Sequence, residues 1–150
     1  MAAFLDMLAW SEGTDNGRQQ TRDRGYDVLV GGTLFQGYSD HPRKLVSLSR
    51  LGIASTAAGR YQLLARYYNV YKKQLGLPDF SPASQDAIAV QQIRERGAIP
   101  DIQAGHLRSA INKCRNIWAS LPGAGYNQHE HKYESLRAQY LLHGGTDTGE

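Results

Sequence analysis

The placement of helix stops along the second half of the chain constrains the fold more than any other feature. From Gly59 onward, apolar residues recur three and four positions apart, which is the spacing of one face of an α-helix. Glycine or proline interrupts this pattern at Gly76 with Pro78, at Gly97 and at Pro122-Gly123. The predicted helices span residues 61–75, 82–97, 107–121 and 129–143. The polar residues 144–150 are expected to form a flexible, frayed tail.

The stretch from Gly13 to Ala58 has a different character, being rich in Gly, Asp, Ser and Thr. Short β-prone runs occur at Tyr26–Val30 and Leu45–Leu48, and glycine pairs and Asp-His-Pro supply turns. We therefore expect two or three short antiparallel strands that form one wall of a cleft. With the helices, this predicts a single, mostly helical α+β domain of 150 residues with a cleft between a small β region and a helical lobe.

Composition narrows the classes of protein to which the chain can belong. Charged residues make up 21% and hydrophobic residues 41%, which is typical of a folded globular protein. No apolar run reaches the length of a membrane span, and no basic-then-apolar leader opens the sequence, so we expect synthesis in the cytoplasm without stable membrane insertion. The single cysteine, Cys114, lies on an apolar helical stripe and is expected to be a buried structural thiol.

The net charge of +3 is compatible with nucleic acid, with an anionic cell-wall polymer or with plain solubility. Nucleic-acid binding predicts lysine and arginine gathered along one helix face. These residues are scattered here, so we expect no nucleic-acid partner.

Glu12 is the first candidate for chemistry. Phe4, Leu8 and Glu12 are spaced four apart, so an amphipathic helix would carry two apolar groups and then an acid on one stripe. Gly13 is a natural residue to end that helix. A carboxyl bordered by apolar packing has its pKa raised and can act as a general acid, although a lone glutamate near a helix end is more often solvated.

Two glycine-rich polar runs, 55–62 and 123–127, stand where helices are expected to begin or end. Small residues allow a ligand to approach the backbone, while Tyr and Asn or Gln offer stacking and amide contacts, a combination that suits sugars. The candidate sugar-binding residues are Ser55, Tyr61, Gln62, Tyr126 and Asn127. Taken singly, each run is also explained by a helix start or a turn.

Together and in this order, the three runs resemble lytic transglycosylases of the lysozyme-like superfamily. Glu12-Gly13 stands where that family often has Glu-Ser, the run 59–62 resembles its Gly-Leu-Met-Gln, and the run 125–127 resembles its Ala-Tyr-Asn. The stretches Phe4–Gln19, Tyr38–Val46 and Ile117–Tyr126 are similar at greater length to a phage member, and the resemblance extends to about Gly145. Relative to that phage member, Ala57 stands where glycine is expected, and Asn127 replaces a glycine.

The resemblance implies an endolysin with a lysozyme-like fold. It implies cleavage of the β-1,4 bond between N-acetylmuramic acid and N-acetylglucosamine, in which the muramic 6-hydroxyl attacks the anomeric carbon and leaves a 1,6-anhydro end. Glu12 would be the single catalytic acid and base, with no cofactor and no metal. It also implies a monomer that is admitted from the host cytoplasm to the periplasm by a holin.

A hydrolytic muramidase on the same fold remains the alternative, and it would need a second carboxylate. Asp27, in a predicted strand, is the best candidate, with Asp15, Asp23 and Asp40 also possible. A glycan-binding module without turnover is a further alternative, against which the intact Glu12 argues. His129-Glu130-His131 resembles a metal pair, but positions i and i+2 lie on different sides of a helix, so solvated or capping roles are expected instead.

Overall fold

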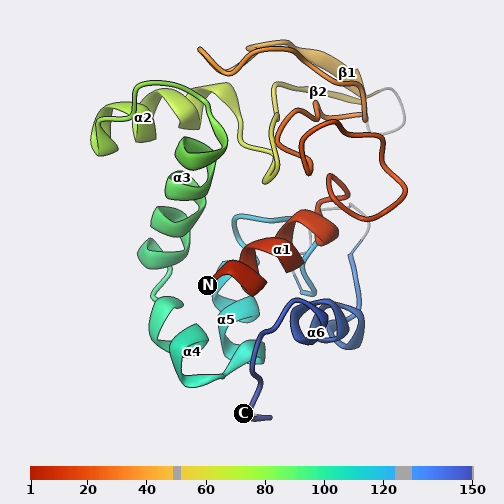
Figure 1. Ribbon diagram of the computed structural model, residues 1–150, viewed down its shortest axis with the longest axis vertical. Coiled ribbons are helices and arrows are strands. Elements are labelled where there is room, and N and C mark those ends of the chain that lie inside the picture. Colours follow the sequence, from red (N-terminus) through yellow and green to blue (C-terminus); the bar gives the residue numbers. More distant parts are fainter. Residues whose placement is uncertain (49–51, 124–129, 150) are drawn as a thin grey trace. The chain divides into compact units, whose positions relative to one another are not determined.

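The computed structural model describes residues 1–48, 52–123 and 130–149, and in these residues it contains six helices and one two-stranded sheet (Figure 1). The chain divides into two compact units. The first unit comprises Met1–Glu12 and Ala89–Glu150, and the second comprises Gly13–Ile88. An α+β architecture was predicted and is confirmed, whereas the single domain and its cleft stay predictions.

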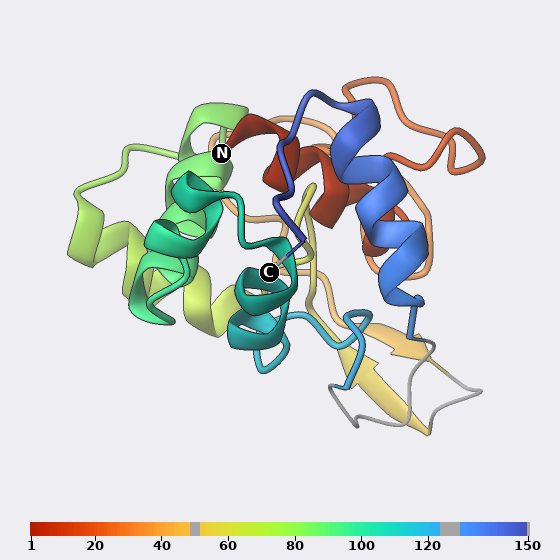
Figure 2. The same ribbon diagram turned by 90° about the horizontal axis from the view of Figure 1, so that it is seen from below.

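In the first unit, α1 (Ala2–Ser11) lies against α6 (Tyr133–Leu142), as Figure 1 shows. The rings of Phe4 and Tyr140 meet edge to face with centroids 6.3 Å apart. Helix α3 (Pro82–Glu95) spans the boundary between the two units in the sequence, and its part from Ala89 belongs to the first unit. Two shorter helices follow it, α4 (Ile99–Ala104) and α5 (Leu107–Cys114), and they contact each other (Figure 2). Their apolar faces form the core of this unit.

The apolar stripe predicted over 107–121 is buried as expected, but the helix that carries it is shorter than predicted. Leu107, Ile111 and Cys114 lie on α5, while Trp118 and Leu121 are buried from the turns that follow. The hydrogen bonds in those turns include ones between residues three apart, such as Leu121 N–H to the Trp118 carbonyl, which are typical of turns. Burial raises the pKa of the Cys114 thiol to about 12, as fits a structural cysteine.

In the second unit, β1 (Val46–Leu48) pairs antiparallel with β2 (Ile53–Ser55), with Val46 opposite Ser55. The strand predicted at Tyr26–Val30 was wrong, because this segment forms only isolated bridges to Leu34 and Ala58. Gly31 and Gly32 both have positive φ angles, of 89° and 100°, and they turn the chain back before a strand can extend.

The helix predicted from residue 61 begins instead at Ala65, as α2 (Ala65–Leu75). Gln62 has a φ angle of 55°, which no right-handed helix accommodates, and Ala58 pairs with Leu63 just before it. Gly76 ends α2 in the left-handed conformation, as predicted, and α3 begins at Pro82, as predicted. The short helix α4 was not predicted.

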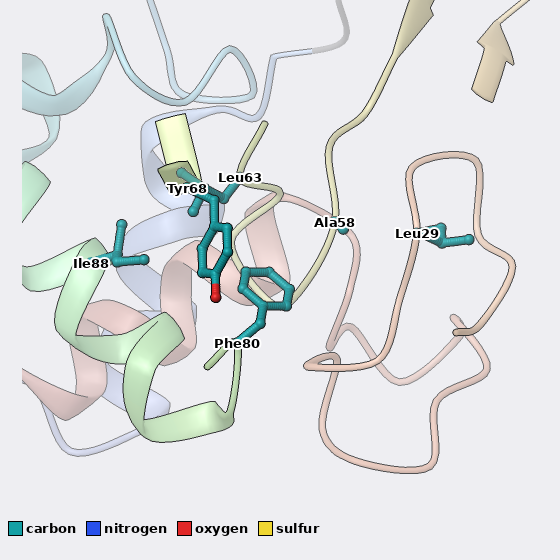
Figure 3. Close-up of a cluster of buried hydrophobic side chains, with 6 residues drawn as sticks. All are labelled: Leu29, Ala58, Leu63, Tyr68, Phe80 and Ile88. Atoms are coloured by element: carbon teal, nitrogen blue, oxygen red, sulfur yellow. The ribbon is translucent and has the colours of Figure 1, made fainter. Parts of the chain in front are cut away.

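The core of the second unit is a cluster beneath α2 and the start of α3 (Figure 3). Tyr68 is fully buried and its ring meets that of Phe80 edge to face, with centroids 5.2 Å apart. The cluster comprises Leu29, Ala58, Leu63, Tyr68, Phe80 and Ile88. It joins the loop region to the helices of the same unit.

The last helix begins at Tyr133, and residues 124–129 lie outside the described part of the chain. The tail that follows has defined partners, which the sequence did not indicate. Asp147 accepts hydrogen bonds from Arg137 at 2.7 Å and from Tyr133 at 3.1 Å, and Thr148 donates its N–H to the Gly105 carbonyl at 2.8 Å. Among the described helices, none combines the length and the apolar character that crossing a bilayer requires.

Candidate active site

Glu12 directly follows the last residue of α1. Its backbone still belongs to the final turn, since its N–H donates to the Leu8 carbonyl at 2.8 Å. Gly13 then adopts a φ angle of 79° and ends the helix, as predicted. Phe4 and Leu8, on the same stripe, are completely buried, so the carboxyl stands at the end of an apolar face.

Ser120 holds the carboxyl of Glu12. The Ser120 hydroxyl donates a hydrogen bond to Glu12 Oε2, and the Ser120 backbone N–H also donates to the carboxyl. The hydroxyl of Ser11, the last residue of α1, lies 2.7 Å from that of Ser120. Because the single proton of Ser120 is given to Glu12, Ser11 is the donor between the two hydroxyls.

His131 holds the two serines from the other side. Its backbone N–H donates to the Ser120 carbonyl at 2.9 Å, and its ring Nε2 lies 2.9 Å from the Ser11 carbonyl. A carbonyl only accepts, so Nε2 carries a proton. The ring also packs on Trp10, with centroids 4.6 Å apart. His131 therefore has defined partners in the structure and is not simply solvated.

Burial raises the pKa of Glu12 from 4.5 to about 7, and the two hydrogen bonds from Ser120 oppose the rise. A carboxyl with this pKa populates both protonation states near neutral pH. It can therefore give a proton to one group and later take a proton from another, which is what acid and base catalysis by one residue requires.

The four acids considered as second carboxylates all lie in the second unit, and each has a local partner. Asp27 is buried and accepts hydrogen bonds from the Thr21 hydroxyl at 2.5 Å and the Arg22 N–H at 3.1 Å. The other three pairs are Asp15 with Arg60 at 3.0 Å, Asp23 with Tyr38 at 2.6 Å, and Asp40 with Arg43 at 2.8 Å. These contacts give each acid a structural role.

The predicted sugar-binding residues are placed as follows. Tyr61 is buried and donates its hydroxyl to Asp86 at 2.6 Å. The Gln62 amide donates to the carbonyls of Val28 and Gly59 at 3.2 and 3.0 Å. Ser55 accepts from the Ala57 N–H at 3.1 Å, and Tyr126 and Asn127 lie outside the described residues. Sugar binding by all five stays a prediction.

The sequence did not indicate Ser120 as a partner of Glu12, nor Ser11 and His131 as partners of Ser120. Ser120 and Glu12 are 108 residues apart, and no periodicity links positions that meet only through tertiary packing. Within residues 1–48, 52–123 and 130–149, no three or more His, Cys, Asp or Glu side chains are grouped so that they could hold a metal ion.

Comparison with known proteins places the chain in a family context. A family model described as Endolysin matches residues 2–147. The endolysin of Escherichia phage lambda is 68% identical over 96% of this chain and 90% of its own length, and that of Escherichia phage P2 is 55% identical over 97% and 93%.

Solved structures agree with this relationship. Bacteriophage lambda lysozyme complexed with a chitohexasaccharide is 68% identical and superposes with a TM-score of 0.95, covering 97% of this chain and 94% of that one. A second structure of lysozyme from bacteriophage lambda gives a TM-score of 0.91 at 66% identity, with the same coverage. The lysozyme-like α+β fold expected from the resemblance is thus confirmed.

Proposed function

The chain belongs to the endolysin family, and from that premise we propose that it is a lytic transglycosylase that cleaves bacterial peptidoglycan. Its substrate is the β-1,4 bond between N-acetylmuramic acid and N-acetylglucosamine. Its product is a glycan end that carries 1,6-anhydromuramic acid. The observation that supports this proposal most is the raised pKa of Glu12, because one carboxyl has to serve in both proton transfers.

In the first transfer, protonated Glu12 gives its proton to the glycosidic oxygen while the bond from that oxygen to the muramic anomeric carbon breaks. In the second, the Glu12 carboxylate takes the proton of the muramic 6-hydroxyl as the oxygen of this hydroxyl bonds to the anomeric carbon. The glutamate ends protonated, as it began. No water is consumed, so no second carboxylate is needed to activate one.

The candidate second carboxylates are already hydrogen-bonded or ion-paired within the protein. This supports attack by the muramic 6-hydroxyl over attack by water. Asp27, the best candidate for a second carboxylate, is buried and accepts two hydrogen bonds from its own loop. A residue that activates water or attacks the sugar needs an oxygen directed at the substrate. Because the Asp27 carboxylate is engaged in this way, hydrolysis is the less favoured reaction. A hydrolytic muramidase is the second candidate function, and it would use Asp27 as its second carboxylate.

For substrate binding, the lambda lysozyme that was solved with a chitohexasaccharide supports recognition of a glycan strand by this chain. We assign the sugar contacts to Ser55, Tyr61, Gln62, Tyr126 and Asn127. The Tyr61 hydroxyl is engaged by Asp86, so Tyr61 would contribute through its ring.

The biological role that fits this chemistry is lysis of the host cell at the end of phage growth. The enzyme would act as a monomer. It would be made in the host cytoplasm and would reach the periplasm when a holin opens the inner membrane.

Mass spectrometry of muropeptides released from purified peptidoglycan tests the reaction. Products that are one water lighter than reducing-end forms, and that resist borohydride, are expected. Reducible muramic ends would instead mean that water is the nucleophile. Glu12→Gln should abolish release of either product while leaving thermal unfolding near that of the wild type, and unchanged lysis by this variant would remove Glu12 from the mechanism.

A further inference from the structure

The Ser120 hydroxyl is bonded to one particular oxygen of the Glu12 carboxyl, Oε2. Oε2 accepts the hydroxyl proton of Ser120, which in turn accepts from Ser11 at 2.7 Å. This chain of hydrogen bonds has one direction, from Ser11 through Ser120 to Glu12. Ser11 is 4% exposed, so water does not readily replace its hydroxyl as the donor to Ser120.

The direction of these hydrogen bonds favours one oxygen of Glu12 as the carrier of the proton. If Oε2 were protonated and donated to Ser120, the Ser120 hydroxyl would need a new acceptor. The neighbouring Ser11 hydroxyl could accept that proton only if it gave up its own donation to Ser120. Protonation of Oε1 leaves the hydroxyl donors of Ser11 and Ser120 in place.

The serines themselves are fixed through their backbones. The N–H of His131 donates to the Ser120 carbonyl at 2.9 Å, and the His131 ring donates to the Ser11 carbonyl at 2.9 Å. The ring is kept in place by Trp10. The hydroxyl pair thus has a rigid support that does not depend on the substrate.

We infer that Ser120, held by Ser11 and His131, is a positioning residue that assigns both proton transfers of Glu12 to the Oε1 atom. This inference rests on the proposed role of Glu12 as the catalytic acid and base. The same oxygen that protonates the leaving group then receives the proton of the 6-hydroxyl, so the carboxyl need not rotate between the two steps. Ser120 acts through Glu12 and touches no reacting atom.

The test compares Ser120→Ala with wild type, with Ser120→Thr, which restores a hydroxyl, and with Ser135→Ala, an exposed serine on α6, as the matched control. We expect Ser120→Ala to lower kcat about tenfold with little change in KM, since a hydrogen bond to a charged group is lost. The alkaline limb of the pH–rate profile of this variant should move to higher pH. The reason is that one of the two hydrogen bonds that lower the pKa of Glu12 is lost. Ser120→Thr should recover most of the rate, and Ser135→Ala should match the wild type.

Each outcome decides one question. If Glu12→Gln is inactive while Ser120→Ala keeps the wild-type kcat and pH profile, the role of Ser120 is overturned and the proposed function stands. If Glu12→Gln stays active, the proposed function fails, and the inference fails with it. If Ser120→Ala does not fold, Ser11→Ala replaces it: this variant should lower kcat about threefold, and an unchanged rate would overturn the inference.

Discussion

Tyr61 donates its hydroxyl to Asp86 Oδ1 at 2.6 Å, and Tyr26 donates to the same oxygen at 2.9 Å. The Tyr61 oxygen also accepts from the Arg60 guanidinium at 3.1 Å. Burial and Asp86 together raise the pKa of Tyr61 far above its usual value, so this hydroxyl stays protonated. A residue singled out as a sugar contact is thus tied into a buried network of its own unit.

This network predicts that Tyr61→Phe lowers stability more than activity. Loss of the hydroxyl removes one donor to Asp86 and one acceptor for Arg60, which should cost about 1–2 kcal/mol in the free energy of unfolding. Chemical denaturation measures this cost, with Tyr26→Phe as the matched control on the same acceptor. Turnover of the folded Tyr61→Phe variant should stay within about twofold of wild type. A much larger loss in turnover, absent in Tyr26→Phe, would show that the hydroxyl itself meets the glycan.

Gly59 is required by its close approach to Gln85. A Cβ at position 59 would lie 2.3 Å from Gln85 Oε1, and this oxygen accepts the Arg60 N–H at 2.9 Å. Gly59→Ala should therefore cost about 1 kcal/mol for its φ angle of 86° and about 2 kcal/mol more for the displaced amide. Gly17→Ala is the matched control, because its φ angle is 81° and no atom lies within 4 Å of the added Cβ. Equal melting temperatures for the two variants would contradict the clash.

The surroundings of His41 predict that the free energy of unfolding falls in mild acid. It is buried, its Nδ1 accepts the Arg43 N–H at 2.9 Å, and its Nε2 donates to the Leu63 carbonyl at 2.8 Å. Burial lowers the pKa of His41 below 6.5, with a smaller lowering effect from Arg43 and opposing effects from the Leu63 carbonyl and Asp40. The unfolded chain therefore binds this proton at a higher pH than the folded chain does.

The contribution of neutral His41 to the free energy of unfolding is fully present above pH 6.5. It is lost as the pH falls from 6.5 toward the lowered pKa of His41 in the folded state. Over that window the loss is at most about 1.4 kcal/mol per pH unit. Urea denaturation between pH 7 and pH 5 measures the slope for wild type and for His41→Gln, whose amide does not titrate. The variant should show the shallower slope, and an identical slope would remove His41 as a source of acid sensitivity.

The sequence predicted the fold best where local signals and tertiary packing agree. The end of α1 at Gly13, the end of α2 at Gly76 and the start of α3 at Pro82 all follow from backbone preferences that the structure keeps. The first turn of the helix predicted from Tyr61 failed because tertiary pairing of Ala58 with Leu63 outweighs the apolar spacing. Glu12 was found from its position on a stripe. Ser120 reaches Glu12, and His131 reaches Ser11, only through packing of distant segments, for which residue spacing holds no signal.

The raised pKa of Glu12 predicts how activity responds to pH. The first step needs the protonated acid, so kcat/KM should fall about tenfold per pH unit above a midpoint near the pKa of about 7. An ordinary glutamate with a pKa of 4.5 would be almost fully ionised at that midpoint. Initial rates of anhydromuropeptide release, measured from about pH 3.5 to 9 at constant ionic strength, give the profile. A falling limb centred near pH 4.5 would mean that burial does not protect the acid.

Asp27 separates the two candidate reactions. If attack comes from the muramic 6-hydroxyl, Asp27→Asn should keep the anhydro product and lose stability, because the amide imperfectly replaces an acceptor of the Thr21 hydroxyl and the Arg22 N–H. The cost in unfolding free energy should be about 1–2 kcal/mol. Asp23→Asn, which weakens the contact with Tyr38, is the control for removing a nearby charge. Product analysis must be done on protein shown to be folded by circular dichroism. Loss of turnover in folded Asp27→Asn alone, with reducing muramic ends from the wild type, would establish Asp27 as the second carboxylate of a hydrolase.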